Sequence, residues 1–362
     1  MQPFITIRQA SATYPVYVGR DLLDEVGSHV APRGRVFVIT SHSLRERFGD
    51  RVAASCEPPA DVISIEEGEA NKTIATASAI VTALLDRGAK RDSMAVVVGG
   101  GMLGDTAGFA ASIFLRGIDL VHVPTTLLAQ VDSSLGGKVA VNHPRGKNLV
   151  GSFHPPRAVF ADTGVLQSLP RNEIASGLFE AMKCGVIGDA ELFSLFESRR
   201  PEILALDHEV ADEVVRRAIR VKADIVSADE READLRRLLN YGHTIAHGIE
   251  AAMHYEGITH GEAVAWGMIG ANATAVRRGV LAEATRRRVD AAISAYRPCV
   301  PARLDPDDIL SATEHDKKNT GAKRIMVLPR EIGSCEIVAV TEDDVRLGIE
   351  AVLQAIAAAT RS

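Results

Sequence analysis

The chain has 362 residues, of which 46% are hydrophobic and 24% are charged, and its formal net charge is −6. This length predicts two domains with enough apolar material for two cores, and the acidic balance argues against general nucleic-acid binding. No apolar run approaches the ~20 residues of a membrane span. The four cysteines are far apart and form no CxxC pair, so we expect no disulfide framework and a reducing, cytosolic location.

Short β-rich runs alternate with helical stretches in the first half of the chain, which is typical of an α/β fold. Alternating apolar residues up to Gly19 predict strand structure at the N-terminus. A helical apolar period over 73–88 ends at Gly88, a residue type that commonly stops helices. Buried parallel strands are predicted at 35–40, 61–66, 94–101, 120–126 and 157–163.

Amphipathic helical patterns dominate the second half, so we place a domain boundary near residue 165, with an α/β domain over 1–165 and a mostly α-helical domain over 166–362. One late strand is expected at 324–329. Charged residues and turn formers predict that 314–323 is the least ordered stretch. Helices are predicted at 172–187, 190–200, 208–228, 235–253, 260–279, 281–296 and 342–359.

A glycine-rich turn, AVVVGGGMLGDTAGFAA, joins a predicted strand to a predicted helix. Gly99, Gly101 and Gly104 match the spacing G-x-G-x-x-G, which lets the backbone approach a pyrophosphate at a helix N-terminus. We interpret this turn as a dinucleotide site, since three consecutive glycines exceed what helix packing requires. The next strand ends in two threonines instead of an acidic residue for a ribose, so EEGEANK (66–72) is the candidate for the adenosine half.

Two further stretches concentrate polar residues among apolar ones. Glu180 and Lys183 are three residues apart and share one face of a predicted helix whose other residues are apolar or small. An exposed pair of this kind contributes only ~0.2–0.5 kcal/mol, so a pair in a buried helix calls for a functional reason. The stretch 125–148 is polar and glycine-rich, and its backbone is predicted to be loop-like. Its candidate residues are Asp132, Lys138, Lys147 and Asn148.

Histidines gather in the helical half of the chain. His243 and His247 are four residues apart, so they lie on one helical face and can bind one metal ion. The general-base Glu that zinc proteases place between two such histidines is missing here. A catalytic zinc takes three protein ligands and keeps one open position. The candidates are Glu180, His243, His247 and His260, and spacing alone leaves open which three of the four bind a metal.

Taken together and in order, seven segments resemble the 3-dehydroquinate synthase family over nearly the whole chain. The resemblance implies a Rossmann-like NAD-binding domain, a mostly α-helical metal- and substrate-binding domain, a divalent metal that is zinc or else cobalt, and a cytoplasmic homodimer. The segments are EEGEANK, GGGMLGDTAGFAA, FLRGI, VPTTLLAQVDSSLGGKVAVNHPRGKN, LRRLLNYGHTIAH, THGEAVAWGM and DKK.

The resemblance also assigns residues to roles. The implied metal ligands are Glu180, His243 and His260, while His247 would face the substrate. The implied NAD-binding residues are Glu67, Gly68, Glu69, Ala70, Asn71, Lys72, Gly99, Gly100, Gly101, Met102, Leu103, Gly104, Asp105, Thr125, Thr126, Lys138, Lys147, Val165, Leu166, Gln167 and Ser168. The implied catalytic and substrate-binding residues are Arg116, Asp132, Lys138, Asn148, Lys183, Lys222, Arg236, Asn240, His247 and a lysine of the DKK run, Lys317 or Lys318.

The implied reaction converts 3-deoxy-D-arabino-heptulosonate 7-phosphate to 3-dehydroquinate and phosphate in the shikimate pathway. It proceeds through transient NAD-dependent oxidation, phosphate elimination, reduction and intramolecular aldol closure, so NAD is recycled. The metal would polarise a substrate oxygen as a Lewis acid. Lysine and arginine side chains would bind the substrate carboxylate and phosphate.

Two alternatives from related enzyme classes remain open. A metal-dependent polyol dehydrogenase needs no phosphate site, so the dense Lys, Arg and Asn set argues against it. Another sugar-phosphate cyclase would tend to replace Lys222, Asn240 or His247, which are all present. A degenerate NAD-binding regulator is disfavoured because no expected ligand is missing. The chain departs from the family pattern at Ser41, Phe114 and Cys184.

Overall fold

The computed structural model describes residues 1–301, 304–320 and 324–361. For residues 314–320 it describes the backbone and not the side chains. The chain forms two compact units. The first unit contains Met1–Leu169 and Ala211–Arg231, and the second contains Pro170–Val210 and Glu232–Ser362. The first unit thus includes a segment from the middle of the chain. The division at residue 165 into an NAD-binding and a metal-binding domain stays a prediction.

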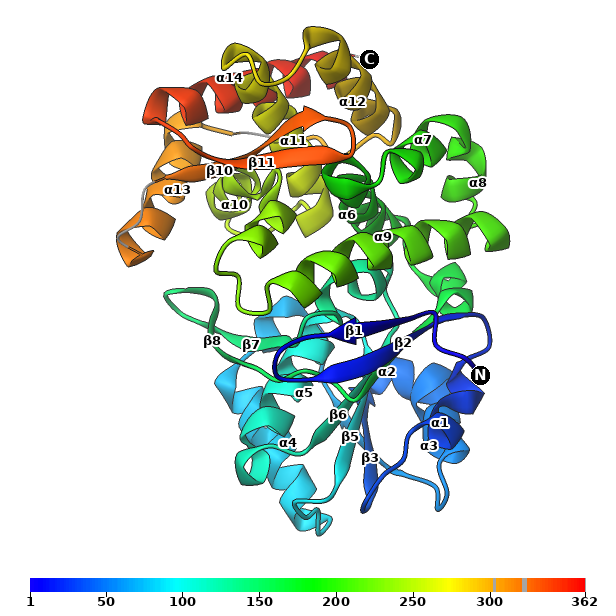
Figure 1. Ribbon diagram of the computed structural model, residues 1–362. Coiled ribbons are helices and arrows are strands. Elements are labelled where there is room, and N and C mark those ends of the chain that lie inside the picture. Colours follow the sequence, from blue (N-terminus) through cyan, green and yellow to red (C-terminus); the bar gives the residue numbers. More distant parts are fainter. Residues whose placement is uncertain (302–303, 321–323, 362) are drawn as a thin grey trace. The chain divides into compact units, whose positions relative to one another are not determined.

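A twisted sheet forms the centre of the first unit (Figure 1). Within the described residues it has seven strands in the order β1-β2-β9-β6-β5-β3-β4. All neighbours pair in parallel except β1 and β2, which form an antiparallel hairpin. The five predicted parallel strands are confirmed, and the predicted N-terminal strand structure consists of two strands. The bounds are β1 (Ile5–Arg8), β2 (Thr13–Gly19), β3 (Val36–Ser41), β4 (Asp61–Ile65), β5 (Met94–Gly99), β6 (Asp119–Pro124) and β9 (Ala158–Asp162).

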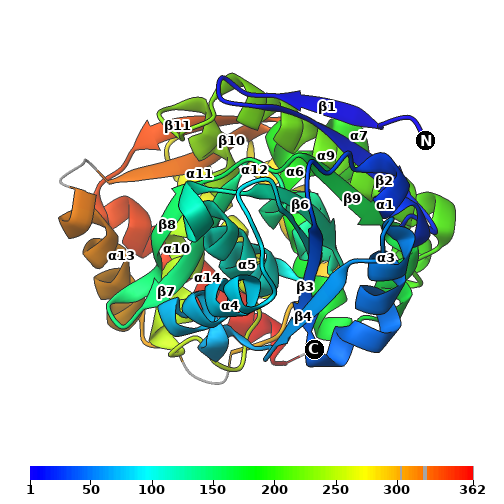
Figure 2. The ribbon, with the colours of Figure 1, turned by 90° about the horizontal axis from the view of Figure 1, so that it is seen from below.

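Helices cover both faces of this sheet. In Figure 2, α4 (Ile74–Asp86) and α5 (Gly101–Ile113) lie on one side of β3, and α1 (Val26–His29) and α3 (Asp50–Ser55) lie on the other. Two hydrophobic clusters fill the two interfaces between the sheet and its helices. Strands that are buried on both faces explain the continuous apolar runs in the sequence.

The prediction of loop-like backbone over 125–148 is wrong for most of its length. Residues Ala129–Ser133 form a π-helical turn, and β7 (Lys138–His143) pairs with β8 (Gly146–Phe153) as an antiparallel hairpin. The hairpin strands are half-exposed, so they tolerate the polar and glycine residues that make the segment read as loop. Backbone pairing decides the structure here, and Lys138, a predicted site residue, lies on a strand.

Helices make up most of the second unit, with α11 (His260–Arg277) at its centre, buried along nearly its whole length. Glycines let its backbone approach its neighbours. A Cβ at Gly261 would lie 2.0 Å from the Ser176 carbonyl oxygen, and one at Gly267 would lie 2.0 Å from the Gly242 carbonyl oxygen. The other elements are α6 (Arg171–Gly188), α7 (Ala190–Ser198), α8 (Arg200–Leu204), α12 (Glu283–Ala295), α13 (Pro306–Thr320), α14 (Glu342–Ala359) and the hairpin of β10 (Ile325–Glu331) and β11 (Ser334–Ala339). The helix α9 (His208–Ala228) contributes most of its length to the first unit.

The single helix predicted over 235–253 is broken. A 3-10 helix, η7 (Leu235–Asn240), is followed by α10 (His243–Ala252). Gly242 between them has φ +82°, a left-handed conformation that glycine adopts readily, so the chain turns there. His243 is therefore the first residue of a helix. The expectation of least order over 314–323 falls mostly outside the described side chains. Among the described residues, no helix is both long and apolar enough to cross a membrane.

Candidate functional site

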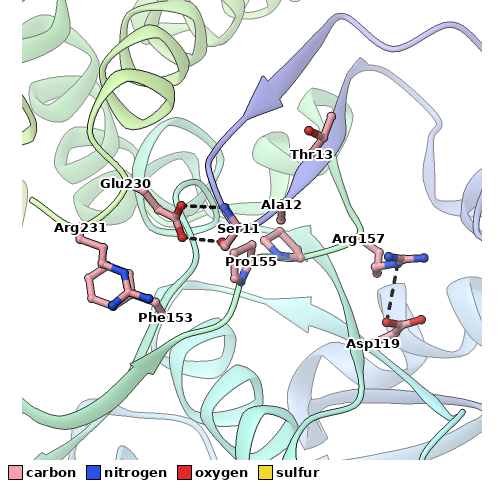
Figure 3. Close-up of a pocket in the computed structure, with 10 residues that line it drawn as sticks. Ser11, Ala12, Thr13, Asp119, Phe153, Pro155, Arg157, Glu230 and Arg231 are labelled. Carbon is pink, nitrogen blue, oxygen red and sulfur yellow. Dashed lines mark hydrogen bonds and ion pairs between the residues drawn. The ribbon is translucent and has the colours of Figure 1, made fainter.

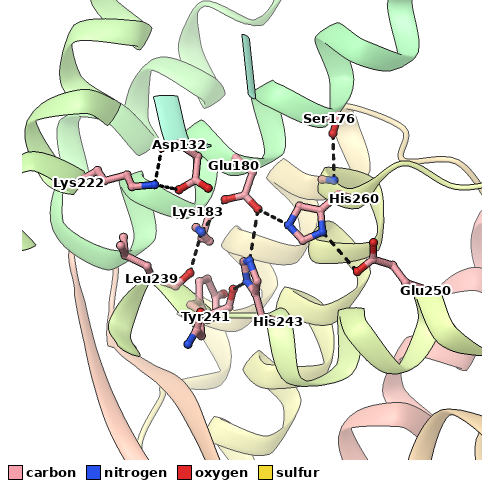
Figure 4. Close-up of polar contacts among 12 residues, drawn as sticks. Asp132, Ser176, Glu180, Lys183, Lys222, Leu239, Tyr241, His243, Glu250 and His260 are labelled. Carbon is pink, nitrogen blue, oxygen red and sulfur yellow. Dashed lines mark hydrogen bonds and ion pairs between the residues drawn. The ribbon is translucent and has the colours of Figure 1, made fainter. Parts of the chain in front are cut away.

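Three side chains of the second unit converge in the geometry of a metal site (Figure 4). Ligand atoms of Glu180, His243 and His260 all lie within 4.8 Å of one another, and no other such group occurs among the residues that the structure describes. The Glu180 Oε1 atom is 3.6 Å from His243 Nε2 and 3.3 Å from His260 Nε2. Two nitrogens and one carboxylate oxygen form a common ligand set for catalytic zinc, so the donor set fits such an ion.

Local sequence positions each member of this group. Glu180 lies in the buried middle of α6 and is 1% exposed. His243 begins α10 directly after the turn at Gly242. His260 begins α11, whose N-terminus is fixed by a capping box between Thr259 and Glu262. Each histidine is therefore placed by the start of a helix, where the backbone direction is well defined.

A buried lysine balances the carboxylate charge. The Lys183 Nζ atom lies 2.5 Å from Glu180 Oε2 and donates to the Leu239 carbonyl oxygen at 2.7 Å. Burial raises the pKa of Glu180, but the Lys183 ammonium and the two imidazoles lower it more, so it lies well below its usual range. Burial and the Lys183 charge lower the pKa of His243 to about 3. Burial also acts to lower the pKa of His260, but contacts with two carboxylates raise it to about 10.

Each imidazole has a second contact on its far side. His243 Nδ1 lies 3.2 Å from the Tyr241 carbonyl oxygen, and His260 Nδ1 lies 3.3 Å from Glu250 Oε2. Sequence reasoning did not single out Glu250, which is 5% exposed. A signal was present, because Glu250 follows His243 by two helical turns and so shares its face of α10.

The structure groups His243 with Glu180 and His260 and leaves His247 outside. The His247 ring centroid lies 5.5 Å from that of His243, but the residue is exposed and adds no ligand atom to the group. The predicted role of His247 in contacting substrate stays a prediction. Nearby, Asn240 donates to Glu232 Oε1 at 3.0 Å, and Arg236 is buried in η7. The side chains of Lys317 and Lys318 lie outside the described residues.

Several predicted substrate residues belong to the first unit. Lys222 on α9 donates to both the backbone carbonyl and the Oδ1 atom of Asp132, each at 2.5 Å. Lys147 and Asn148 lie on β8, and Asn148 has φ +56° with its N–H donating to Asn142 Oδ1 at 3.0 Å. Arg116 ends the short helix η4 (Phe114–Arg116) with φ +74°. The structure thus joins Asp132 to Lys222 directly, although 90 residues separate them in the chain.

The glycine-rich turn passes from β5 into α5, as predicted. The α5 N-cap is Gly100, which has no side chain to cap the helix, so its first backbone N–H groups can face an anion. Packing also needs these glycines: a Cβ at Gly99 would lie 2.7 Å from Leu103 Cδ2, and one at Gly100 would lie 2.9 Å from Thr126 Cγ2. The run of glycines therefore fits both packing and phosphate binding, and by itself does not choose between them.

The EEGEANK segment follows β4 and is tied to the same region. Lys72, 5% exposed, forms an ion pair with Asp105 on α5 at 2.6 Å. Burial raises the pKa of Asp105 more than the Lys72 charge lowers it. Ser41, which departs from the family pattern, donates to Glu67 Oε1 at 2.5 Å. The remaining predicted cofactor residues lie at Thr125 and Thr126 after β6 and at Val165, Leu166, Gln167 and Ser168 in the 3-10 helix η6 (Thr163–Ser168).

A pocket of about 330 Å³ lies elsewhere in the first unit (Figure 3). Glu230 accepts hydrogen bonds from the backbone and hydroxyl of Ser11, and Arg157 faces Asp119 at 3.6 Å. The contacts between Ser11 and Glu230 hold the turn between β1 and β2 against the segment after α9. None of the ten lining residues is a predicted site residue, so we do not assign this pocket to the reaction.

Comparisons with known proteins match both halves of the chain to the same family. Models of the 3-dehydroquinate synthase N-terminal and C-terminal domains match residues 62–176 and 177–319. The chain belongs to the 3-dehydroquinate synthase family. It is 40% identical to the 3-dehydroquinate synthase of Koribacter versatilis, over 97% of this chain and 96% of that protein. It is 41% identical to that of a Thermoanaerobacter species, over 94% and 98%.

Solved structures agree with this family. A 2-epi-5-epi-valiolone synthase from Streptomyces hygroscopicus with NAD⁺ and Zn²⁺ bound has a TM-score of 0.87 at 30% identity, over 97% of this chain and 98% of that one. A 2-deoxy-scyllo-inosose synthase with NAD⁺ and Co²⁺ has a TM-score of 0.86 at 30% identity, over 95% and 98%. Glycerol dehydrogenase from Schizosaccharomyces pombe is 16% identical, with a TM-score of 0.69 over 99% and 92%, so it shares the fold alone. The predicted fold class is confirmed.

Proposed function

We propose that the protein converts 3-deoxy-D-arabino-heptulosonate 7-phosphate to 3-dehydroquinate and phosphate, as a step of the shikimate pathway. The observation that carries this proposal is the Glu180, His243 and His260 group, found in a chain whose two halves match both domains of the family. The reaction passes through transient oxidation, phosphate elimination, reduction and intramolecular aldol closure. The protein supplies orientation and charge for these steps.

Glu180, His243 and His260 would hold a divalent metal, which we propose to be zinc. When bound, this ion polarises a substrate oxygen. Three protein ligands leave a coordination position open for that oxygen. Lys183 offsets the charge of Glu180 in the buried α6 and keeps its carboxylate ionised. The two synthases of known structure named above contain Zn²⁺ or Co²⁺, which supports the choice of metal class.

We further propose that the first unit binds NAD, which exchanges a hydride with the substrate and is recycled. The N-terminus of α5 at Gly100 and Gly101 would take the pyrophosphate, because it presents backbone N–H groups and a favourable helix dipole. Glu67 would accept hydrogen bonds from a ribose, since Ser41 fixes its carboxylate at the end of β3. This contact gives a role to one residue that departs from the family pattern.

Cationic side chains would bind the two anionic ends of the substrate. Lys183 and Arg236 are buried in the second unit, and Lys222 is buried in the first. Burial strengthens the attraction between these cations and a bound carboxylate or phosphate. Lys222 also orients Asp132 by donating to both its backbone and its side chain. We propose that His247 handles a proton near the leaving phosphate.

The proposal also includes a cytosolic homodimer in which Arg116 reaches the active site of the partner subunit. Exposed apolar side chains flank this arginine: Ile113 is 49% exposed and Leu115 is 39% exposed. Mixing inactive Arg116→Ala and Lys183→Ala chains should restore part of the activity, because one of the two sites in a heterodimer is intact. Each variant mixed with itself is the control. Verified heterodimers without activity would rule out completion in trans.

Phosphate release tests the function directly. With substoichiometric NAD⁺ and zinc, the purified protein should release many equivalents of phosphate from the heptulosonate phosphate and accumulate no lasting NADH absorbance. One NADH per product would instead indicate a polyol dehydrogenase. Another sugar-phosphate cyclase is the second candidate, favoured by the solved structures at 30% identity. Faster turnover of another sugar phosphate than of the heptulosonate phosphate would establish it.

A further inference from the structure

Both histidines of the metal group direct their Nε2 atom toward Glu180. Both Nε2 atoms face Glu180 Oε1, and both Nδ1 atoms face acceptors on the opposite side (Figure 4). The acceptor for His243 is the Tyr241 backbone carbonyl, and the acceptor for His260 is the Glu250 carboxylate. Neither acceptor can donate, so each Nδ1 atom carries a hydrogen and Nε2 is the atom available to a metal.

The two acceptors differ in charge. A backbone carbonyl is neutral, whereas the Glu250 carboxylate brings a full negative charge to within 3.3 Å of the His260 ring. Hydrogen bonds to ionised acceptors are roughly twice as strong as those between neutral groups. A carboxylate bonded to the far nitrogen of a ligating imidazole fixes its tautomer and orientation and makes the inner nitrogen a better donor. Of the two histidines, His260 is therefore held by the stronger hydrogen bond at Nδ1.

Burial makes the position of Glu250 unusual. Its side chain is 7% exposed, and α10 has no capping requirement there, since Glu250 lies in the body of the helix and not at its start. A desolvated carboxylate is costly unless charged or hydrogen-bonding groups meet it. The imidazole of His260 meets it on one side, on a different helix, so Glu250 links α10 to the start of α11.

We propose that Glu250 is a positioning residue for the metal site: its carboxylate holds His260 through Nδ1 so that Nε2 is directed at the ion beside Glu180. This inference rests on the proposed function, because it requires a metal at Glu180, His243 and His260. It adds a residue that does not itself bind the metal, and it predicts that metal affinity depends on an acidic side chain outside the ligand set.

The same helix pair offers a matched control. Glu262 on α11 is 7% exposed, but its carboxylate accepts hydrogen bonds from the backbone N–H groups of Thr259 at 3.0 Å and Cys299 at 3.1 Å. Its role is to cap a helix, and it has no contact with the His260 ring among its described hydrogen bonds and ion pairs. Glutamine also serves at this position of a capping box, so Glu262→Gln should keep the start of α11 and the position of His260. It should lower thermal stability without changing the affinity for zinc.

The experiment measures zinc affinity by competition with a chromophoric chelator. Metal is first stripped from the unmodified protein and from three variants, Glu250→Gln, Glu250→Asp and Glu262→Gln. Glu250→Gln keeps the shape of the side chain and should bind zinc about 10–100-fold more weakly. Glu250→Asp keeps the charge on a shorter side chain, and its zinc affinity should fall between those of the unmodified protein and Glu250→Gln. The visible spectrum of the Co²⁺-loaded protein should change in Glu250→Gln and not in Glu262→Gln, which separates an altered ligand field from a loss of fold.

Each outcome has a distinct meaning. Equal zinc affinity in Glu250→Gln and the unmodified protein would overturn the positioning role. If Glu250→Gln does not fold, Glu250→Met decides, because it also removes the carboxylate, and a zinc affinity within about twofold of the unmodified protein would overturn the role in the same way. An unmodified protein that binds no zinc would instead defeat the proposed metal site, while a tight-binding protein without phosphate-releasing activity would defeat the proposed reaction alone.

Discussion

Replacing Lys183 by methionine should destabilise the metal-free protein strongly. The ammonium and the Glu180 carboxylate are 2.5 Å apart, with side chains 2% and 1% exposed. At an effective dielectric constant near 20, this attraction amounts to about 6–7 kcal/mol. Methionine recovers part of that loss, because a buried ammonium no longer has to be desolvated. Breaking a buried pair by removing one partner typically costs about 3–5 kcal/mol, and we expect a loss in that range.

A bound metal should reduce this loss. A divalent ion beside Glu180 supplies the positive charge that Lys183→Met removes, so zinc should stabilise the variant more than the unmodified protein. The assay is urea unfolding with and without zinc, followed by the fluorescence of Trp266, the single tryptophan, which is buried in α11 of the second unit. The shift in the urea midpoint then reports the stability of the second unit, which contains the ion pair between Lys183 and Glu180.

An exposed ion pair provides the control. Arg330 on β10 and Glu336 on β11, also in the second unit, lie 3.9 Å apart, and their side chains are 64% and 36% exposed. Arg330→Met should cost less than about 1 kcal/mol. If metal-free Lys183→Met unfolds within about 1 kcal/mol of the unmodified protein, the buried carboxylate does not need its cation and the reasoning fails.

Four further variants test separate parts of the structure. His243→Ala should lose its zinc and the hydride step, whereas His247→Ala should keep zinc and slow a later step by about 10²–10⁴-fold; equal zinc loss by elemental analysis would make both residues ligands. Burial lowers the pKa of His122 from 6.5 to about 4, so protonation of this histidine should cost the folded protein about 3 kcal/mol as pH falls from 6.5 to 4, and His122→Gln should reduce the pH dependence of unfolding by about that amount in urea titrations across this range. Gly242→Ala should destabilise the second unit by at least about 1–2 kcal/mol and weaken zinc binding, because its φ is +82° and a Cβ would lie 2.9 Å from the Met268 backbone nitrogen; unchanged zinc affinity would show that the turn does not position His243.

Sequence patterns predicted the parallel strands and the long helices well, because continuous burial leaves a clear apolar signature. The last helix was predicted at 342–359 and is observed as Glu342–Ala359. The β7–β8 hairpin was missed because its half-exposed strands carry polar residues and glycines, as a loop does. The second strand of the late hairpin, Ser334–Ala339, is also only partly buried and left no alternating pattern strong enough to detect.

Tertiary packing decided what local patterns could not. The apolar period over 235–253 predicted one helix, but Gly242 turns the chain and makes His243 a helix start. The amphipathic pattern of α9 predicted a helix correctly without saying that most of it would pack in the first unit. In the candidate site, spacing left four possible ligands, and the three-dimensional arrangement selects three. Glu250 was overlooked because an acidic residue in an amphipathic helix ordinarily faces solvent.

The glycine contacts of α11 have a consequence for the order in which the protein folds and binds its metal ion. At Gly261 and Gly267, main chain meets main chain, with no side chain between α11 and the segments around Ser176 and Gly242. The distance between the helices that carry the candidate ligands is therefore set by backbone contact and not by the ion. In small zinc domains, by contrast, folding and metal binding are one event. Here the chain should fold first and acquire its ion afterwards, so that a cell can store it empty, load it, and exchange one divalent ion for another without refolding.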